Sequence, residues 1–233
     1  MAVTTDITGA YTNIPHDDGS DCLKEVLDDR LDKKIPSDFI VSLMELVQKY
    51  NIFEFHDGML WSQRIGVAMG PHPAPSYANL YLARRIDQYI SELGYKYGEN
   101  GKSAFLMFKR FLDDIFKKFK GTTKQLHNLF SDMNKIHPTL KFTIMHTTPE
   151  SEAEEDQCDF EKTSSIPFLD TSISIENGRV EVDLHRKKTH RNQYLLPSSC
   201  HPKATSAAIP YSLALRIVCI CTSQEKRDLS LKD

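Results

Sequence analysis

The densest chemical signal in this 233-residue sequence is an adjacent pair of aspartates, Asp113 and Asp114, inside the apolar run FLMFKRFLDDIFKKFKG. Strong β-formers flank the two charges, so the segment predicts a hairpin that carries the pair near its bend. Two carboxylates in an apolar setting repel each other unless a cation binds both, and a hard divalent cation prefers such oxygen ligands. A plain surface turn is the alternative, because Asp-Asp alone is a weak motif.

A third carboxylate favours the metal hypothesis. Asp6 lies in VTTDITGAY, whose apolar and β-branched residues predict a strand, and Tyr11 follows five residues later. One carboxylate on a strand and a pair on a neighbouring hairpin suit a two-metal site, which serves phosphoryl transfer by stabilising the attacking and leaving oxygens. Basic residues bracket the pair and suit phosphate chemistry, although a solvated strand face explains some of them. They are Lys109, Arg110, Lys117, Lys118 and Lys120.

The elements that must position these groups follow from hydrophobic spacing and turn residues. A strand is expected at 140–146, a hairpin within 52–68, and two strands around the tight turn Asn177-Gly178. The strands and helices do not alternate regularly, which favours an α+β fold over a doubly wound sheet. Apolar residues at helical spacing predict helices over 20–31, 37–50, 74–93, 123–136 and 212–221.

The overall charge first argues against a nucleic-acid-binding protein. The chain has 29 Lys and Arg against 32 Asp and Glu, a net charge of −3, whereas such proteins are usually basic. However, residues 150–161 contain seven acidic residues and no basic one, which is typical of a solvated or disordered insertion. Without these seven the net charge is +4, so the acidic average does not exclude nucleic acid.

Five scattered cysteines, an odd number, suit reduced thiols in an intracellular compartment. We expect no membrane association, because no apolar run approaches the length of a membrane span and the N-terminus lacks a signal-peptide pattern. The cluster Cys200-His201 with Cys219 and Cys221 fits no familiar structural zinc spacing, so we expect no zinc site there.

Three segments in this order and spacing, TDITGAYTNIP, GVAMGPHPAPSYANLYL and KRFLDDIF, resemble the reverse transcriptases of Penelope-like retroelements. The later segments HPTLKFT, IPFLDTSI, THRNQYLLPSSCHP and IPYSLALRIVCIC look like that group's palm and early thumb. The resemblance covers nearly the whole chain. It implies an α+β reverse-transcriptase palm, an antiparallel sheet with packed helices, together with partial fingers and the start of the thumb. The implied domains are a palm core (1–148), an acidic insertion (149–163), and the palm end with a primer-side hairpin and thumb start (164–233).

The resemblance also implies roles for individual residues. Asp6, Asp113 and Asp114 are expected to be catalytic and, with the Ile7 carbonyl, to bind two Mg²⁺ ions, with Mn²⁺ as a substitute. Tyr11 is expected to exclude the sugar 2′-hydroxyl and so favour dNTP over rNTP. The remaining implied contacts are Gln63, Gly70 and Lys141 with the nucleotide, and Gly66, Lys187 and Arg191 with nucleic acid.

The function implied by this resemblance is RNA-directed DNA polymerisation, with an RNA template, a DNA primer and dNTP as partners and a nuclear location. The family's upstream fingers and following endonuclease are not recognised in this sequence, so the chain is expected to be a fragment. A catalytically inactive remnant that binds nucleic acid or protein is the main alternative. A metal-dependent nuclease is a further one, but it leaves Tyr11 and the GVAMG loop unexplained.

Overall fold

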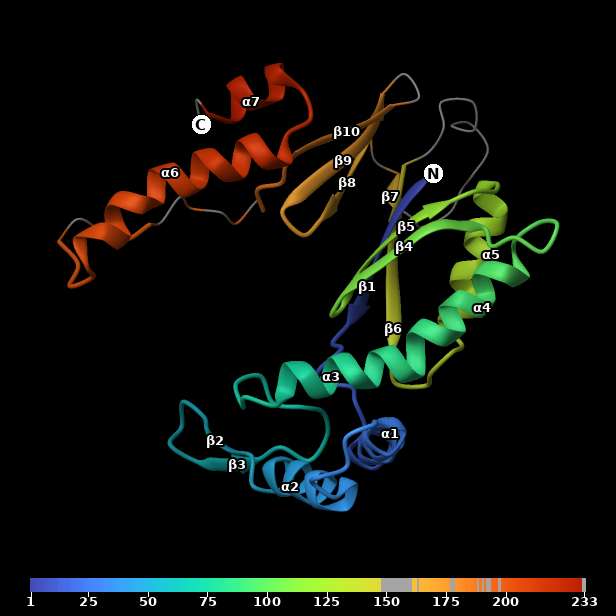
Figure 1. The fold of residues 1–233 in the computed structure, drawn as a ribbon, viewed down its shortest axis with the longest axis vertical. Helices are drawn as coiled ribbons and strands as arrows, with labels where there is room; N and C mark the ends of the chain where they lie inside the picture. Colours follow the sequence, from blue (N-terminus) through green and yellow to red (C-terminus); the bar gives the residue numbers. More distant parts are fainter. Residues whose placement is uncertain are drawn as a thin grey trace. The chain divides into compact units, whose positions relative to one another are not determined.

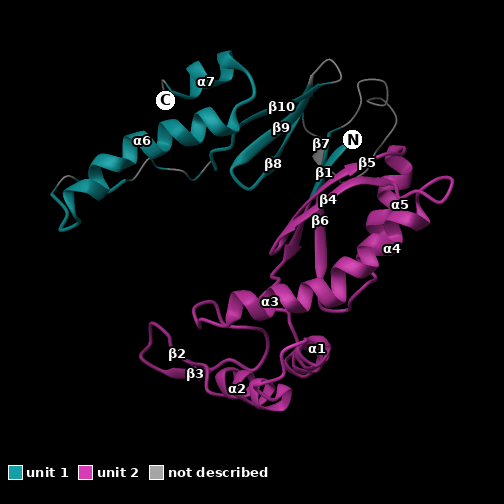
Figure 2. Cartoon of the chain, in the orientation of Figure 1, with its two compact units in different colours: residues 1–4, 145–233 teal, residues 5–144 magenta. Residues whose placement is uncertain are grey.

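The computed structural model describes residues 1–147, 161–162, 164–176, 179–187, 189, 191, 194–196 and 198–231. The chain forms two compact units, residues 5–144 and residues 1–4 with 145–233 (Figure 2). Most of the acidic stretch expected at 149–163 and the expected turn at Asn177-Gly178 lie outside the described residues.

A five-stranded sheet has the order β4-β5-β1-β6-β7 (Figure 1). Strands β4 and β5 form an antiparallel hairpin. The Thr147 amide donates to the Ala2 carbonyl (3.0 Å), so the end of β6 lies beside the start of β1 and these strands also run antiparallel. Strand β7 pairs parallel to its neighbour, β6. The strand bounds are β1 Ala2–Thr8, β4 Phe105–Phe111, β5 Asp114–Phe119, β6 Lys141–His146 and β7 Glu161–Lys162.

The helices of residues 5–144 confirm the predicted pattern with shifted ends. The helix expected at 20–31 begins four residues earlier, because Asp17 and Asp18 in its first turn interact favourably with the helix dipole. The long helix expected at 74–93 is interrupted by a π-helical turn, η1, a feature common near functional sites. The bounds are α1 His16–Asp29, α2 Ser37–Lys49, α3 Ala74–Leu82, η1 Ala83–Asp87, α4 Gln88–Lys96 and α5 Thr123–Met133.

The core of residues 5–144 lies between the sheet and the helices α3–α4 and α5 (Figure 1). In β5 and β6 buried residues alternate with more exposed ones, as the pleat of a strand requires when one face is covered. Ile86, Ile90, Leu126 and Leu129 are fully buried on the helix side. The predicted hairpin within 52–68 is also present, as β2 (Ile52–Glu54) paired with β3 (Leu60–Ser62).

Lys117 is not the surface cation that the sequence suggests. Its side chain on β5 is fully buried, with 1% of the residue exposed. The ammonium donates to the Thr5 hydroxyl (2.8 Å), lies 3.2 Å from the Met133 sulfur and sits 5.7 Å from the centre of the Phe105 ring. Burial disfavours the charged form and lowers the pKa of Lys117 to about 7. Lys117 therefore belongs to the core, and the basic surface beside the aspartate pair is smaller than predicted.

The unit of residues 1–4 and 145–233 has a three-stranded antiparallel sheet of order β10-β9-β8, followed by two helices. Strands β8 (Ser165–Phe168), β9 (Thr171–Glu176) and β10 (Arg179–Leu184) confirm the predicted strand pair. Helix α6 (Lys203–Ile220) begins nine residues before the expected 212 and continues through Pro210; α7 (Gln224–Ser230) follows it. No helix in the described parts of the chain is long and apolar enough to cross a membrane.

The buried lysine makes stability depend on pH. Because the pKa of Lys117 is lower in the folded chain, the unfolded chain binds one more proton between about pH 7 and 10, and folding stability rises with pH there. The expected contribution is at most about 1.4 kcal/mol per pH unit. Lys117→Met should remove this rise, measured as the free energy of unfolding in urea at several pH values. Lys118→Met, an exposed neighbour, is the control and should leave the rise unchanged.

Candidate metal and nucleotide site

The aspartate pair lies at a hairpin bend, as the sequence predicts. The β4–β5 register pairs Phe111 with Asp114, which leaves Leu112 and Asp113 as a two-residue turn. Leu112 has φ +53°, a left-handed conformation that costs a non-glycine residue about 1–2 kcal/mol. Asp113 therefore sits in a strained turn, and Asp114 is the first residue of β5.

A backbone hydrogen bond brings Asp6 to this turn. The Ile7 amide on β1 donates to the carbonyl of Asp113 (3.1 Å), which ties the carboxyl half of β1 to the bend of the hairpin. Burial raises the pKa of Asp6, the negative charge of Asp113 raises it further, and a hydrogen bond from the Ile7 backbone opposes both effects. The carboxylates of Asp6 and Asp113 therefore share one electrostatic environment.

These two side chains fit a divalent cation. They supply hard oxygen donors, and a cation between them would remove their mutual repulsion. The Ile7 carbonyl accepts from the Ala10 amide (3.2 Å) and has a second lone pair that could face a cation. Over the residues whose placement is described, however, no three or more His, Cys, Asp or Glu side chains converge as a metal site. Of the three predicted carboxylates, the structure thus brings together Asp6 and Asp113.

Tyr11 interacts electrostatically with Asp113. Burial raises the pKa of Tyr11, and the negative charge of Asp113 raises it further. The Tyr11 carbonyl accepts from the Val67 amide (2.7 Å), and the Gly66 amide donates to the Ile14 carbonyl (3.1 Å). The segment 66–67 therefore runs along residues 11–14, and Gly66 belongs to the same region as Tyr11.

Gly66 is a glycine for two physical reasons. Its φ is +80°, and a Cβ atom there would lie 2.5 Å from the carbonyl oxygen of Thr12. The His16 ring Nε2 donates to the Gly66 carbonyl (2.8 Å), which fixes the close approach. Gly70, with φ +139°, also requires a glycine backbone, but a Cβ atom there would approach no described atom within 4 Å. Of these two glycines, Gly66 is therefore the one held against the loop that carries Tyr11.

Gln63 is engaged in its own hairpin. Its side-chain oxygen accepts from Asn51 (2.8 Å), and its side-chain nitrogen donates to the Ile65 carbonyl (2.9 Å). These two bonds close the base of the β2–β3 hairpin. The role of Gln63 and Gly70 toward a nucleotide stays a prediction.

Lys141 lies at the relevant end of the sheet. It is the first residue of β6, and because β6 runs antiparallel to β1, the start of β6 lies near the end of β1. The Thr139 hydroxyl donates to the Asn13 carbonyl (2.7 Å), which confirms this proximity. The exposed Lys141 ammonium donates to the Asn134 carbonyl at 3.5 Å, a long contact.

Lys187 and Arg191 belong to the unit of residues 145–233. They line a cavity of about 960 Å³ between the end of β10 and helix α6. Both are exposed. Among the described residues, the cavity is also lined by the basic side chains of His185, Arg186 and Arg216.

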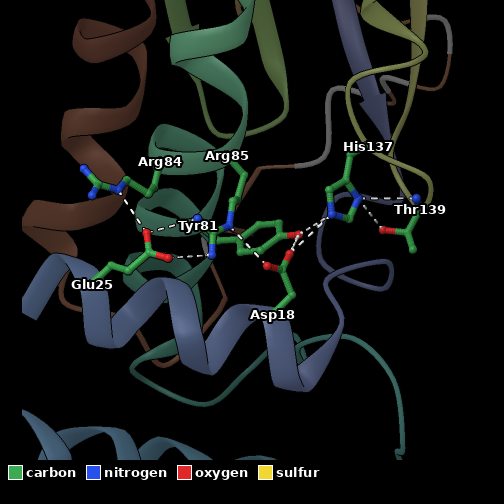
Figure 3. Close-up of polar contacts among 7 residues, drawn as sticks. All are labelled: Asp18, Glu25, Tyr81, Arg84, Arg85, His137 and Thr139. Atoms are coloured by element: carbon green, nitrogen blue, oxygen red, sulfur yellow. Dashed lines mark hydrogen bonds and ion pairs between the residues drawn. The ribbon is translucent and has the colours of Figure 1, made fainter.

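The sequence interpretation missed the polar network around Asp18 (Figure 3). Asp18 on α1 accepts hydrogen bonds from the Tyr81 hydroxyl (2.6 Å) and Arg85 Nε (3.2 Å), and His137 Nε2 lies 3.3 Å away. Burial raises the pKa of Asp18, but these polar contacts outweigh burial and lower it. Arg85 also forms a two-pronged pair with Glu25 (3.0 Å each).

A sequence signal for this network exists. Asp18 and Glu25 are seven residues apart, so they share one face of a helix, and the tandem arginines 84–85 supply the matching charge. The network continues from His137 to Thr139, whose hydroxyl holds Asn13, two residues after Tyr11. Its effect is to fix the loop that follows β1.

Comparison with solved structures finds a similar fold in telomerase. The structure of telomerase from Candida tropicalis in complex with a TWJ fragment of telomeric RNA matches with a TM-score of 0.54 at 12% identity, covering 99% of this chain and 36% of that one. The corresponding Candida albicans complex matches with a TM-score of 0.54 at 12% identity, covering 92% and 34%. This chain spans about a third of the length of those proteins. At this identity the likeness shows the fold alone, a mixed α+β fold with antiparallel sheets that is similar to part of telomerase.

A second similarity concerns the C-terminal part. Residues 193–233, under a fifth of the chain, match the family described as the animal helix-turn-helix domain. This range contains α6 and α7, which are joined by Cys221–Ser223. No curated protein matches the sequence.

The close approach at Gly66 can be measured against a glycine of similar conformation. Gly101 has φ +72°, but a Cβ atom there would approach no described atom within 4 Å, so Gly101→Ala should cost only the backbone strain, about 1 kcal/mol. Gly66→Ala should cost about 3 kcal/mol, because the Thr12 backbone must also move. Urea denaturation gives both values. Equal losses would show that segment 66–67 does not press against the Tyr11 loop.

Proposed function

We propose that this chain is the palm of an RNA-directed DNA polymerase of the Penelope-like group, which adds a dNTP to a primer 3′-hydroxyl on an RNA template. The observation that carries the proposal is the hydrogen bond between the Ile7 amide and the Asp113 carbonyl, which sets Asp6 beside the hairpin bend and near Tyr11. The reverse-transcriptase-like fold supports it independently.

In this proposal Asp6 and Asp113 hold Mg²⁺, with the Ile7 carbonyl and Asp114 as further oxygen donors; Mn²⁺ would substitute. Mg²⁺ held there would polarise the α-phosphate and would stabilise the developing charge on the leaving pyrophosphate. The two carboxylates are oriented by backbone bonds of β1 and the turn, so the chain supplies their geometry before substrate arrives. The primer 3′-oxygen would then form a bond to the α-phosphorus and lose its proton to solvent water, while the bond between the α-phosphorus and the pyrophosphate oxygen breaks and pyrophosphate leaves.

The neighbouring residues set substrate choice in the same scheme. The Tyr11 ring fills the space beside the sugar 2′ position and so favours dNTP. Gly66, whose side-chain position is occupied by the Thr12 backbone, would contact nucleic acid through its own backbone. Lys141, at the same end of the sheet, offers its ammonium to the triphosphate. Gln63 and Gly70 complete the nucleotide-side contacts.

Loss of either carboxylate should abolish polymerisation. Asp6→Asn and Asp113→Asn should each reduce Mg²⁺-dependent primer extension on an RNA template by at least about 100-fold, because the metal supplies several kcal/mol of transition-state stabilisation. Asp28→Asn removes an exposed carboxylate at the far end of α1 and is the matched control, with activity unchanged. Extension by Asp113→Asn at the wild-type rate would contradict the proposal.

A second candidate function is nucleic-acid binding without catalysis. The cavity in residues 145–233 favours it, because basic side chains line an apolar floor that includes Leu213 and Ile217. Arg216 is paired with Asp170 (2.6 Å), whereas Lys187 and Arg191 are exposed. Exposed cations over an apolar surface suit the phosphates and bases of a single strand. The similarity of residues 193–233 to a helix-turn-helix family points the same way.

Binding is separable from catalysis when metal is removed. In EDTA, the double variant Lys187→Ala/Arg191→Ala should bind a short single-stranded oligonucleotide about tenfold more weakly, measured by fluorescence anisotropy. The plot of its log affinity against log salt concentration should be less steep by about 1.4, which corresponds to two lost phosphate contacts. Lys33→Ala/Lys34→Ala removes two exposed lysines of the other unit and should bind normally. Binding by a wild-type chain that never extends a primer would favour this second function.

A further inference from the structure

Arg110 is a fully bonded side chain near the hairpin bend. It lies on β4 with its side chain 7% exposed. Nε and Nη2 donate to the two carboxylate oxygens of Asp87 (2.7 and 2.9 Å), in the two-pronged arrangement that fixes a guanidinium. Nη1 donates to the Asn79 side chain (2.9 Å) and to the carbonyl of Leu112 (3.1 Å), and Nη2 also reaches the Asn79 carbonyl (3.5 Å). All five N–H groups are therefore used.

The bond to Leu112 acts on Asp113. The Leu112 carbonyl belongs to the peptide plane that precedes Asp113, and Arg110 holds it. The Asp113 carbonyl belongs to the plane that follows, and the Ile7 amide holds that one. Because peptide units are planar, fixing the planes on both sides of a residue fixes its φ and ψ and so the direction of its Cβ. Arg110 and Ile7 together set where the Asp113 carboxylate points.

The turn needs such a restraint. Leu112 has φ +53°, a strained conformation that persists only where the surroundings impose it. The restraint comes from the helix side, since Asp87 is the last residue of the π-helical turn η1 and Asn79 lies on α3. Arg110 thus links the helix to the bend and is not one of the free cations that the sequence suggests.

We propose that Arg110, held by Asp87, is a positioning residue that orients the Asp113 carboxylate for a divalent cation. The role in metal binding rests on the proposed function; the role in fixing the turn does not. The competing explanation is an ordinary structural ion pair, of which the same helix offers an example. Arg85, also in η1, pairs with Glu25 in the same two-pronged manner, and its contacts go to α1.

The first measurement uses the full chain without metal. Lysine cannot make the fork to Asp87 and the bond to Leu112 together, so Arg110→Lys should free the bend. Amide hydrogen exchange, resolved by NMR, should become about tenfold faster at Asp113 and Asp114 after correction for global stability. Arg85→Lys is the matched control and should leave these two amides unchanged. Asp87→Asn, which removes the anchoring charge but keeps the shape, should free the bend in the same direction and serves if Arg110→Lys does not fold.

The second measurement is Mn²⁺ binding followed by electron paramagnetic resonance. Arg110→Lys should weaken the affinity about tenfold, as expected when a residue that orients a ligand is lost. Arg84→Lys, which alters a guanidinium paired with Glu25 and Asp29 on α1, is the control for this measurement and should not weaken it. If the amides of Asp113 and Asp114 exchange no faster in Arg110→Lys than in Arg85→Lys, the inference is overturned, whatever the Mn²⁺ affinity. If the bend is freed but Mn²⁺ affinity is unchanged, the role in metal binding is overturned. A wild-type chain that binds no Mn²⁺ contradicts the proposed function and this metal role together, and leaves the exchange result to decide the role in the turn.

Discussion

The pairing of β1 with the β4–β5 hairpin is the constraint on which the candidate site depends. One backbone hydrogen bond, from Ile7 to the Asp113 carbonyl, brings a carboxylate near the start of the chain beside one from its middle. The Asp6 carboxylate does not favour this placement by itself, because burial and the negative charge of Asp113 both raise the pKa of Asp6. The sheet imposes the proximity through backbone bonds that do not depend on side-chain charge. Such an imposed repulsion suits a site that is completed by a cation.

Two groups of charged side chains near the candidate site hold backbone segments in place. Arg110 fixes the bend, and the Asp18 network fixes the loop after β1 through His137 and Thr139 (Figure 3). Both networks are anchored in the same helix, at Tyr81, Arg85 and Asp87. One set of side chains from this helix restrains the bend, and another set restrains the Tyr11 loop. The helix therefore fixes the position of the bend relative to the Tyr11 loop.

Local patterns were enough to predict much of this arrangement. Hydrophobic periodicity and turn residues are properties of short segments. They predict the hairpin with Asp113 at its bend, the strand around Asp6, and the helices of residues 37–50 and 74–93. Helix ends were less accurate: α6 starts well before 212 because Pro210 is accommodated inside it. The partners of Lys117, Arg110 and Asp18 could not be predicted, because each is set by packing between segments far apart in sequence. From the sequence alone, Lys117 looks like a surface cation because it follows the aspartate pair. Its burial depends on the helices that cover one face of the sheet, which the local sequence does not reveal.

This correction changes where nucleic acid would be bound. Of the five cations around the aspartate pair, Lys117 is buried and Arg110 is neutralised by Asp87, so the local excess of positive charge near the bend is reduced. Lys109, Lys118 and Lys120 remain exposed near the bend, and the exposed cations Lys187 and Arg191 lie in the unit of residues 145–233, which also carries the similarity to a helix-turn-helix family. Phosphate contacts supply most of the affinity for nucleic acid, whereas catalysis needs few charges placed accurately. Under the proposed function, the oriented carboxylates lie in residues 5–144, where Lys109, Lys118 and Lys120 stay exposed, and Lys187 and Arg191 would add exposed cations in residues 145–233.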